Sequence, residues 1–369
     1  MNNMQFVTSP YLYIYRQDDA VWSIVSYLDE MLFSLDKRDM ELLRFCRLPK
    51  TATEIKKKHT EDAFESFVNR KLLLNRNEMW KQFCIKYVEI EITSHCNFRC
   101  RYCPNHYHAK KPSYMVLELY NNIIDQLAEM ESVEYVTLHG YNEPLLDCFF
   151  KDRINKLAEK ELKLVLFTNA SLLNDDIVAI LKKSGVLKLL KVNFPTLDRK
   201  RFQHLTDSAQ FELVKANIEN AIQKQLPIEI ICNGTNMDYA ELKRYFADIE
   251  VKQHNTNDRA GILKNEYAMH YYYGKRLNGC SQVTDWAHIG VNGEVYLCYM
   301  DYYKKYNLGN LQASPLQDIL AGETAENFRK TVFGFLPSGT KWICRRCFQN
   351  YISRVLARNS KFFRSETGE

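Results

Sequence analysis

The sequence lacks a long hydrophobic run. No stretch approaches the roughly 18 uncharged apolar residues that a membrane-spanning helix needs, and residues 1–10 show neither the basic nor the apolar segment of a secretion signal. We therefore expect a cytoplasmic protein with no membrane partner. A large excess of one charge is also missing, since the net charge is only +5 on 369 residues. A charge this mild permits an acidic substrate but does not by itself indicate nucleic acid, which makes DNA binding an unlikely function.

Cysteine, by contrast, is abundant, with 11 residues. A cytoplasmic compartment keeps thiols reduced, so the placement of the cysteines matters more than their number. Seven of them fall in two groups with the spacing of metal ligands, which favours metal binding over a disulfide framework. The other four are scattered among apolar residues: Cys46, Cys84, Cys148 and Cys232.

Residues 83–265 alternate apolar strands with amphipathic helices. The six expected strands are Val88–Thr93, Tyr135–His139, Leu164–Thr168, Leu189–Phe194, Ile228–Cys232 and Ile249–Gln253. Such an alternation predicts an α/β fold with a parallel sheet. Six units are too few for an eight-stranded barrel, so a partial six-unit (β/α) barrel and a doubly wound sheet both stay open. In either fold the chemistry belongs at the carboxyl ends of the strands.

The flanking regions predict two smaller modules. Residues 1–82 combine aromatic, β-branched strands (Tyr11–Tyr15 and Val21–Leu28) with helices that we expect over Asp39–Cys46, after Thr51 and over Glu61–Leu74. This pattern is typical of a winged-helix-like module. Residues 266–350 form a small C-terminal domain with a hairpin at Ala287–Cys298, and residues 351–369 are expected to fray as a tail.

The first cysteine group follows the first expected barrel strand. Cys96, Cys100 and Cys103 have the spacing Cys-x-x-x-Cys-x-x-Cys. Three thiolates on a four-iron cluster leave one iron open to a small molecule. A zinc site with His95 or His106 as the fourth ligand is the alternative.

The motif resembles the signature of the radical S-adenosylmethionine (SAM) superfamily, including the aromatic Tyr102 before the third cysteine. The resemblance implies that the open iron of a [4Fe-4S] cluster chelates SAM. One electron from the cluster then cleaves SAM to methionine and a 5′-deoxyadenosyl radical. It also implies that the backbone around Tyr102 contacts adenine, and that a flavodoxin or ferredoxin type of protein supplies the electron.

Other segments resemble further parts of the family's SAM pocket. Gly140-Tyr141-Asn142-Glu143-Pro144 is similar to a Gly-x-Gly-Glu-Pro turn, in which Gly140 allows close approach and Glu143 binds the SAM ammonium group. Asn142 replaces the second glycine, and because asparagine tolerates left-handed dihedral angles we expect the turn to survive. The remaining expected contacts to SAM, or to an anionic substrate in the case of the arginine, are Thr168, Asn169, Asn193 and Arg259.

The second cysteine group consists of Cys280, Cys298, Cys344 and Cys347. Four soft ligands suit zinc or an iron–sulfur cluster. The spacing resembles the SPASM domain in its shortened "twitch" form, which implies one auxiliary [4Fe-4S] cluster and therefore two such clusters in all.

Two further residues are candidates for catalysis. Cys232 ends a strand and is expected near the barrel interior as a hydrogen-atom donor, with a buried apolar role as the alternative; Asp301 is a candidate general base.

The N-terminal module resembles the PqqD-like peptide-recognition element, which adds a peptide strand to an exposed sheet edge. Our leading hypothesis is therefore a radical SAM enzyme that modifies a ribosomal precursor peptide by cross-link, thioether, oxidation or epimerisation. The alternative is a twitch-type dehydrogenase or tailoring enzyme acting on a sugar or aminocyclitol. A non-catalytic zinc protein would require both cysteine groups to bind zinc.

Overall fold

The computed structural model describes residues 4–16, 21–254, 256–266, 268–269, 277 and 279–347. The chain packs into two compact units. One, the N-terminal unit, contains Met1–Cys84, Tyr272–Asp285 and Leu320–Glu369; the other, the barrel unit, contains Ile85–Tyr271 and Trp286–Ile319. The expected tail over residues 351–369 lies outside the described residues, and the domain limits expected from the sequence stay predictions.

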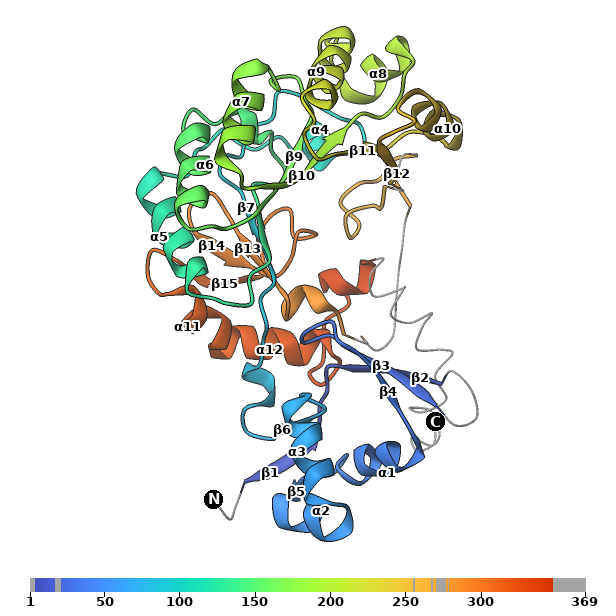
Figure 1. Ribbon diagram of the computed structural model, residues 1–369, viewed down its shortest axis with the longest axis vertical. Coiled ribbons are helices and arrows are strands. Elements are labelled where there is room, and N and C mark those ends of the chain that lie inside the picture. The colour runs from blue at the N-terminus through green and yellow to red at the C-terminus, as the bar shows by residue number, and fades with distance from the viewer. Residues whose placement is uncertain are drawn as a thin grey trace. The chain divides into compact units, whose positions relative to one another are not determined.

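The barrel unit is built on a sheet whose first six strands follow the order of the chain. They are β7 (Tyr87–Ile90), β8 (Tyr135–Thr137), β9 (Leu164–Thr168), β10 (Leu187–Asn193), β11 (Ile228–Cys232) and β12 (Glu250–Gln253). Neighbouring strands are parallel throughout this run (Figure 1). A doubly wound sheet would reverse its order part-way, so the partial (β/α) barrel is confirmed.

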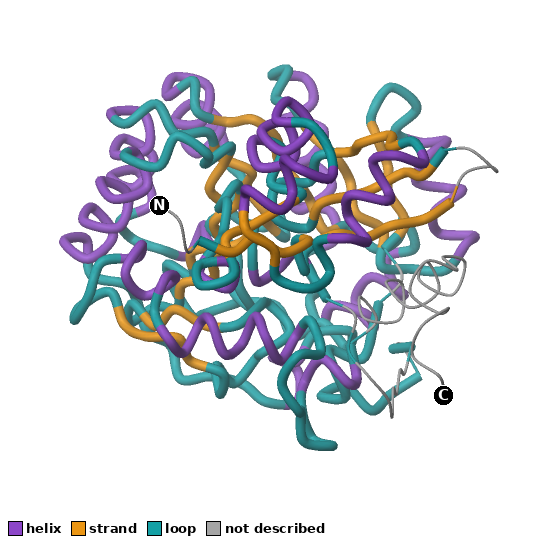
Figure 2. Tube along the Cα trace, turned by 90° about the horizontal axis from the view of Figure 1, so that it is seen from below, coloured by secondary structure: helices purple, strands orange, loops and turns teal. Residues whose placement is uncertain are grey.

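The connecting helices, purple in Figure 2, cover one face of the sheet. They are α5 (Leu117–Ala128), α6 (Phe150–Glu159), α7 (Asp175–Ser184), α8 (Arg199–Thr206), α9 (Phe211–Gln223) and α10 (Asn236–Tyr245). Each buries an apolar stripe, such as Ile123 and Leu127 on α5, and polar side chains cap several N-termini, such as Asn174 before α7. We had not expected α8, whose sequence is mostly polar.

The two faces of the sheet differ in chemistry. On the helix-covered face, Val88, Val136 and Ile230 are fully buried. Because side chains alternate along a strand, the opposite face carries Lys191 and its register partner Glu229, whose charged groups lie 3.3 Å apart. We call this second side the polar face.

The predicted hairpin is confirmed as β13 (Trp286–Ile289) and β14 (Glu294–Tyr296), which turn through Asn292 and Gly293. The sequence did not indicate which strand this hairpin would pair with. β13 pairs in parallel with β7, and β14 pairs with β15 (Asn307–Asn310), so the hairpin extends the barrel sheet to nine strands. The segment that follows β14 is thereby fixed next to the first barrel strand.

The N-terminal unit contains two three-stranded sheets. One joins β1 (Gln5–Thr8), β5 (Lys50–Thr51) and β6 (Leu73–Asn75); the other joins β2 (Leu12–Arg16), β3 (Trp22–Ser26) and β4 (Leu32–Leu35). The helices α1 (Lys37–Phe45), α2 (Ala52–Lys58) and α3 (Glu61–Asn69) supply side chains to the same core, including Leu43, Ile55 and Phe67. Downstream, α12 (Glu323–Val332) belongs to the same unit.

The prediction of one helix over Glu61–Leu74 is wrong at its end. Lys71 takes a left-handed φ of 56°, and the N–H of Leu72 donates to the carbonyl of Phe67 (2.9 Å). This is a Schellman-type termination, after which the apolar Leu73 enters β6 instead of a further helical turn. In the described part of the chain, no helix is long and apolar enough to cross a membrane.

Candidate active site

The loop that carries Cys96, Cys100 and Cys103 follows β7 and is held by backbone contacts to α8. The N–H groups of Arg99 and Arg101 donate to the carbonyls of Thr206 (3.1 Å) and Leu205 (2.9 Å). After Cys103 the chain enters the short helix α4 (Pro104–Tyr107), with proline at its first position. The unexpected helix α8 therefore positions the cysteine loop.

The three thiols lie within electrostatic range of one another. Burial raises the pKa of the Cys100 thiol to about 12, and the neighbouring Cys103 raises it further. Burial also raises the pKa of Cys96 and of Cys103, the latter opposed by Arg259 and Lys110. Thiolates crowded in this way need positive charge, which the irons of a cluster provide. The residues therefore fit a cluster held by Cys96, Cys100 and Cys103. Tyr102 is 8% exposed, and its hydroxyl lies beside Cys100.

The turn after β8 packs against both ends of the cysteine loop. The N–H of Glu143 donates to the carbonyl of His95 (2.9 Å), and the side chain of Asn105 donates to the carbonyl of Tyr141 (2.6 Å). A Cβ at Gly140 would lie 3.0 Å from Glu91 Cγ, so a larger residue here would press on the buried side chain of Glu91. Asn142 has no left-handed dihedral angle; the turn survives without the conformation that we expected it to need.

The carboxylate of Glu143 links this turn to the end of β9. It accepts hydrogen bonds from the hydroxyl of Thr168 (2.8 Å) and the N–H groups of Asn169 (2.7 Å) and Leu145 (3.2 Å). Burial raises its pKa to about 7, against the lowering effect of these bonds. The expected contact of Glu143 with the SAM ammonium group stays a prediction, and the structure adds a positioning role toward Thr168 and Asn169.

Asn97 is a site residue that the sequence analysis missed. Its amide accepts from Asn169 (2.8 Å) and donates to the hydroxyl of Ser171 (2.8 Å). The sequence feature that could have identified Asn97 is its position between Cys96 and Cys100 in the cysteine motif. These contacts fix the cysteine loop to the turn after β9.

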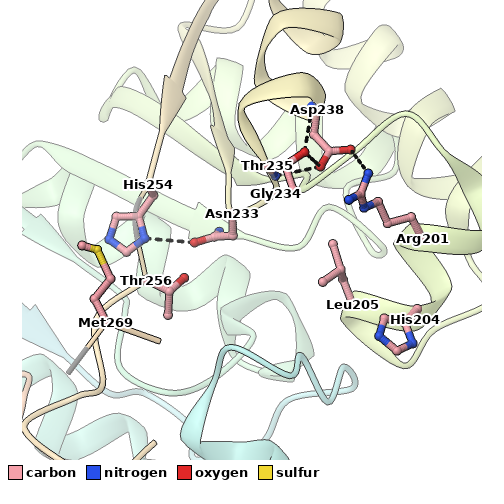
Figure 3. A pocket seen from close by; sticks show the side chains of 10 residues that line it. All are labelled: Arg201, His204, Leu205, Asn233, Gly234, Thr235, Asp238, His254, Thr256 and Met269. Atoms are coloured by element: carbon pink, nitrogen blue, oxygen red, sulfur yellow. Dashed lines mark hydrogen bonds and ion pairs between the residues drawn. The ribbon is translucent and has the colours of Figure 1, made fainter. Parts of the chain in front are cut away.

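A cavity of about 400 Å³ opens at the carboxyl ends of β11 and β12 (Figure 3). His254 and Asn233 form one side, and Arg201 and Asp238 the other. The Asn233 amide accepts from His254 (2.9 Å) and donates to Asn193 (3.3 Å), so a residue that lines the cavity contacts the predicted residue Asn193. The cavity also touches Leu205, whose carbonyl holds the cysteine loop.

Arg259 lies among aromatic rings, as its guanidinium carbon is 5.9 Å from the ring centres of both Tyr141 and Tyr299. Its Nε is buried and has no hydrogen-bond partner among the described residues. Arg259 has a φ of 49°, and the next two residues also have positive φ values. Strain of this kind persists where the surroundings enforce it and is common at functional sites. An anionic group of SAM or of a substrate would satisfy this arginine.

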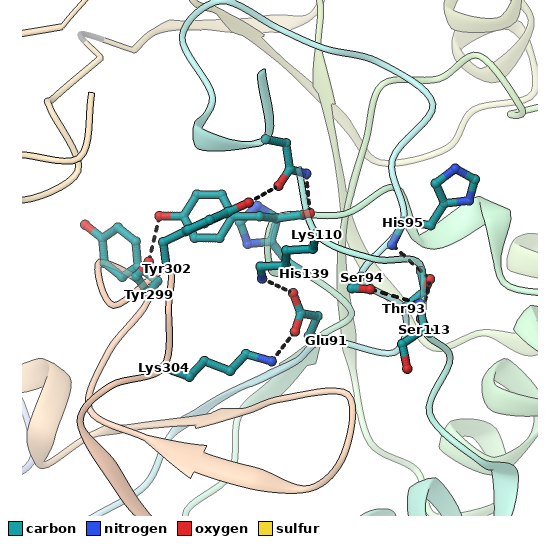
Figure 4. A network of polar contacts seen from close by, with 12 residues as sticks. Glu91, Thr93, Ser94, His95, Lys110, Ser113, His139, Tyr299, Tyr302 and Lys304 are labelled. Carbon is teal, nitrogen blue, oxygen red and sulfur yellow. Dashed lines mark hydrogen bonds and ion pairs between the residues drawn. The ribbon is translucent and has the colours of Figure 1, made fainter. Parts of the chain in front are cut away.

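The segment after β14 forms a further wall that the sequence did not reveal (Figure 4). Lys110 and Lys304 both bind the carboxylate of Glu91, the former at 2.7 Å. The hydroxyl of Tyr141 donates to the carbonyl of Tyr299 (2.8 Å). Residues that follow Cys298 are thus anchored to the turn that carries Glu143.

A second buried carboxylate, Glu89, sits among polar residues from several strands. It lies 3.2 Å from His139 Nδ1 and 3.4 Å from His288 Nδ1, and accepts from the Tyr296 hydroxyl (3.1 Å). Burial by itself raises the pKa of Glu89, but the two histidines outweigh it, so the net pKa is lowered. Of these four side chains, His139 is the one that reaches solvent, with 34% of its side chain exposed.

The expected orientation of Cys232 is wrong. Cys232 shares the helix-covered face with Ile230, and its thiol donates to the carbonyl of Pro195 (3.3 Å) and accepts from the N–H of Gly234 (3.4 Å). Full burial raises its pKa to about 11. The strand alternation points the thiol away from the polar face, although it lies within electrostatic range of Tyr102; a role as hydrogen-atom donor stays a prediction.

Asp301 is 4% exposed, and its carboxylate accepts from the N–H of Tyr306 (2.7 Å) in a local turn. Burial raises its pKa. These contacts assign Asp301 a structural role, and a role as general base stays a prediction.

The second cysteine group divides between the two units. Cys280, Cys344 and Cys347 belong to the N-terminal unit, where burial and mutual proximity raise the pKa of the Cys280 thiol to about 12. Cys298 is buried in the barrel unit. In the described ranges, no three His, Cys, Asp or Glu side chains could hold a single metal ion.

Comparison with protein families identifies this site. The model of the radical SAM superfamily matches residues 90–249, and that of the SPASM iron–sulfur cluster-binding domain matches residues 280–348. The chain therefore belongs to the radical SAM superfamily. It is a radical SAM enzyme with a C-terminal SPASM domain, so the zinc alternative for the first cysteine group is excluded.

Similar proteins include both an aminocyclitol dehydrogenase and enzymes solved with peptides. The S-adenosyl-L-methionine-dependent 2-deoxy-scyllo-inosamine dehydrogenase of Niallia circulans is 24% identical over 66% of this chain and 85% of its own. SuiB of Streptococcus suis, solved with the precursor peptide SuiA, covers 94% of both chains at a TM-score of 0.60 and 14% identity. anSMEcpe, solved with AdoMet and the Kp18Cys peptide, covers 68% of this chain and 83% of its own at a TM-score of 0.55 and 15% identity.

When bound, the [4Fe-4S] cluster supplies the electron that cleaves SAM to a radical able to remove a hydrogen atom from a substrate. The chain's own contribution is positional. Cys96, Cys100 and Cys103 would hold the cluster, and α8 and Asn97 hold the loop that carries them. Arg259 offers a positive charge at the side of Cys103.

Proposed function

We propose that this enzyme modifies a ribosomal precursor peptide that its N-terminal unit recognises. The supporting observation is that the fold similarity to SuiB with its precursor peptide extends over 94% of this chain and so includes most of the N-terminal unit. The similarity to the dehydrogenase, in contrast, covers only 66% of this chain. An enzyme that acts on a small molecule does not need a unit such as residues 1–82. Peptide recognition by a PqqD-like element gives this unit a function.

An edge strand is available for such a peptide. β4 pairs with β3 on one side only among the described strands. Met31 is 52% exposed and Leu32 62% exposed, so apolar side chains accompany the free edge. An unpaired strand edge offers a row of backbone donors and acceptors to an extended peptide.

The register of β4 identifies the backbone groups that would bind the peptide. The N–H of Ser26 donates to the carbonyl of Met31 (3.0 Å), which makes this a hydrogen-bonded pair. Bonded and non-bonded pairs alternate in an antiparallel ladder, so the pairs of Leu32 with Val25 and Ser34 with Ser23 are non-bonded. The N–H groups of Leu32 and Ser34 therefore point outward.

Binding of fluorescent copies of candidate precursor peptides, taken from short open reading frames next to the gene, tests the proposal when measured with the full-length protein. Ser34→Pro removes one outward donor without disturbing the pairing with β3, and Ser34→Ala keeps it. We expect Ser34→Pro to weaken binding about tenfold or more and Ser34→Ala to bind like the wild type. Equal binding by all three proteins would contradict recognition at this edge, and no binding by the wild type would contradict the peptide function.

The alternative function is oxidation of an alcohol in a sugar or aminocyclitol, favoured by the sequence similarity to the inosamine dehydrogenase. Turnover of such an alcohol together with SAM, in the absence of any peptide, would support it.

Further parts of the proposal concern cofactors and partners. We infer that Cys280, Cys298, Cys344 and Cys347 hold one auxiliary [4Fe-4S] cluster and that a flavodoxin or ferredoxin type of protein supplies electrons. We also infer that Asn193 and the backbone near Tyr102 contact the nucleoside of SAM, beside the cavity in Figure 3 to which Asn193 is linked through Asn233. Quantitation of iron and sulfide after anaerobic reconstitution tests the cluster number.

A further inference from the structure

Asn142 has a side chain at a position where the related turn usually has glycine. Both polar atoms of its amide, Oδ1 and Nδ2, are buried and have no hydrogen-bond partner in the part of the chain that the structure describes. Leaving a buried amide without partners costs about 1–3 kcal/mol per unsatisfied group. Such a group calls for a specific explanation, and a bound molecule is one.

The backbone on either side of Asn142 leaves the side chain little freedom to find a protein partner. The preceding carbonyl, of Tyr141, accepts from Asn105, and the following N–H, of Glu143, donates to His95. His95 directly precedes Cys96, and Asn105 lies two residues after Cys103. The amide is therefore held between the two ends of the loop whose cysteines bind the cluster.

The chemistry of an amide matches the group expected there. The methionine end of SAM carries an ammonium group, which donates hydrogen bonds, and a carboxylate, which accepts them. Asn142 offers one acceptor and two donor hydrogens. A glycine at this position offers backbone groups alone, and an aliphatic side chain offers none.

We propose that the side chain of Asn142 binds the amino-acid end of SAM directly, as a contact added to those of the backbone turn. Without SAM, the buried amide lacks hydrogen-bond partners, which lowers the stability of the fold. Bound SAM supplies those partners and so stabilises the folded protein. This inference depends on the radical SAM class alone and holds whether the substrate is a peptide or a small alcohol.

Two variants separate binding from space filling. Asn142→Gly removes the amide and its volume, and Asn142→Leu keeps a similar volume without polar atoms. After anaerobic cluster reconstitution, SAM binding is measured by equilibrium dialysis, and the melting temperature is measured with and without SAM. We expect both variants to retain iron and sulfide, to bind SAM about tenfold more weakly or worse, and to show a smaller rise of melting temperature on SAM addition.

Without SAM, Asn142→Leu should melt at or above the wild-type temperature, because it removes an unsatisfied buried amide. Wild-type SAM affinity and an unchanged SAM-induced shift in both variants would overturn the proposal. Weaker binding by Asn142→Gly with normal binding by Asn142→Leu would also overturn it, by showing that the side chain only fills space. A reconstituted wild-type protein that binds no SAM would instead contradict the cofactor site itself.

Discussion

At the scale of single residues, the barrel unit concentrates charge where a sheet interior is usually apolar. Glu89 and Glu91 are 4% and 1% exposed. Each is surrounded by partners from other strands or loops: histidines and a tyrosine for Glu89, two lysines for Glu91. Buried charges persist when they are paired and hydrogen-bonded, so these partners allow the two carboxylates to lie inside the barrel unit.

The pairing of Glu89 predicts a pH-dependent stability. Its pKa in the folded protein is lowered below the ordinary value of 4.5. The stabilisation is therefore present above about pH 4.5 and is lost as the pH falls toward the folded-state pKa. Glu89→Gln should lower the free energy of unfolding by about 2 kcal/mol near neutral pH and by a smaller amount near about pH 3, where part of the stabilisation is already lost. Denaturant unfolding at both pH values measures this, and an equal difference at the two would contradict it.

The cysteines allow a matched pair of variants. Cys103 belongs to the cluster loop, whereas Cys148 is exposed and lies outside both groups. Cys103→Ala should lower the iron content and abolish SAM binding, because three thiolates are needed to hold a cluster with one open iron. Cys148→Ala should change neither, as measured by iron analysis and equilibrium dialysis. Full SAM binding by Cys103→Ala would contradict the assignment.

At the scale of elements, the turn after β9 carries a conformational cost. Ala170 has a φ of 58°, in the left-handed region that favours glycine. Ala170→Gly should therefore raise the free energy of unfolding by about 1 kcal/mol. Ala158 lies within α6, where Ala158→Gly should lower it by a similar amount. Thermal unfolding of both variants measures the two effects, and destabilisation by Ala170→Gly would show that the methyl group contributes packing there.

The element after the Glu143 turn depends on a fully buried ion pair. Arg153, on α6, binds the carboxylate of Asp147 with neither side chain exposed. Arg153→Met should destabilise the protein by about 3–5 kcal/mol, since it leaves a buried carboxylate unpaired. Arg153→Met combined with Asp147→Leu should recover part of that loss, as judged by denaturant unfolding. A double variant less stable than Arg153→Met alone would contradict this.

The elements that the sequence predicted well are those in which apolar residues recur with a clear helical or strand periodicity. The apolar strand Leu164–Thr168 and the helix Asp175–Ser184 occur with the expected bounds, because their hydrophobic patterns face one core. The helix α8 was missed because six of its eight residues are polar, Arg199–Arg201, Gln203, His204 and Thr206. The pairing of β13 with β7 depends on contacts far apart in the chain, which no local pattern encodes.

In the candidate site, too, the features set by local sequence were predictable and those set by distant contacts were not. The cluster cysteines were predictable because their spacing within one loop fixes their proximity. The orientation of Cys232 was not, because its strand, Ile228–Cys232, is apolar on both faces apart from Glu229 and gives little sign of which side the thiol takes. Tyr299 and Lys304 were missed because their role depends on the position of the hairpin.

At the scale of the whole molecule, two compact units each hold part of the predicted chemistry. The barrel unit contains the residues predicted to bind SAM, and the N-terminal unit contains the exposed edge of β4 together with Cys280, Cys344 and Cys347. The SPASM match over residues 280–348 draws on both units. Under the proposed function, the barrel unit generates the radical and the N-terminal unit recognises the substrate.

The central claim is tested most directly by anaerobic incubation of the reconstituted enzyme with SAM, a reductant and the peptide encoded beside its gene, followed by mass spectrometry. The account predicts a mass change or a changed stereocentre in the peptide, formed together with 5′-deoxyadenosine and absent with Cys103→Ala. Cleavage of SAM that leaves the peptide unaltered, together with oxidation of a sugar or aminocyclitol alcohol, would contradict it.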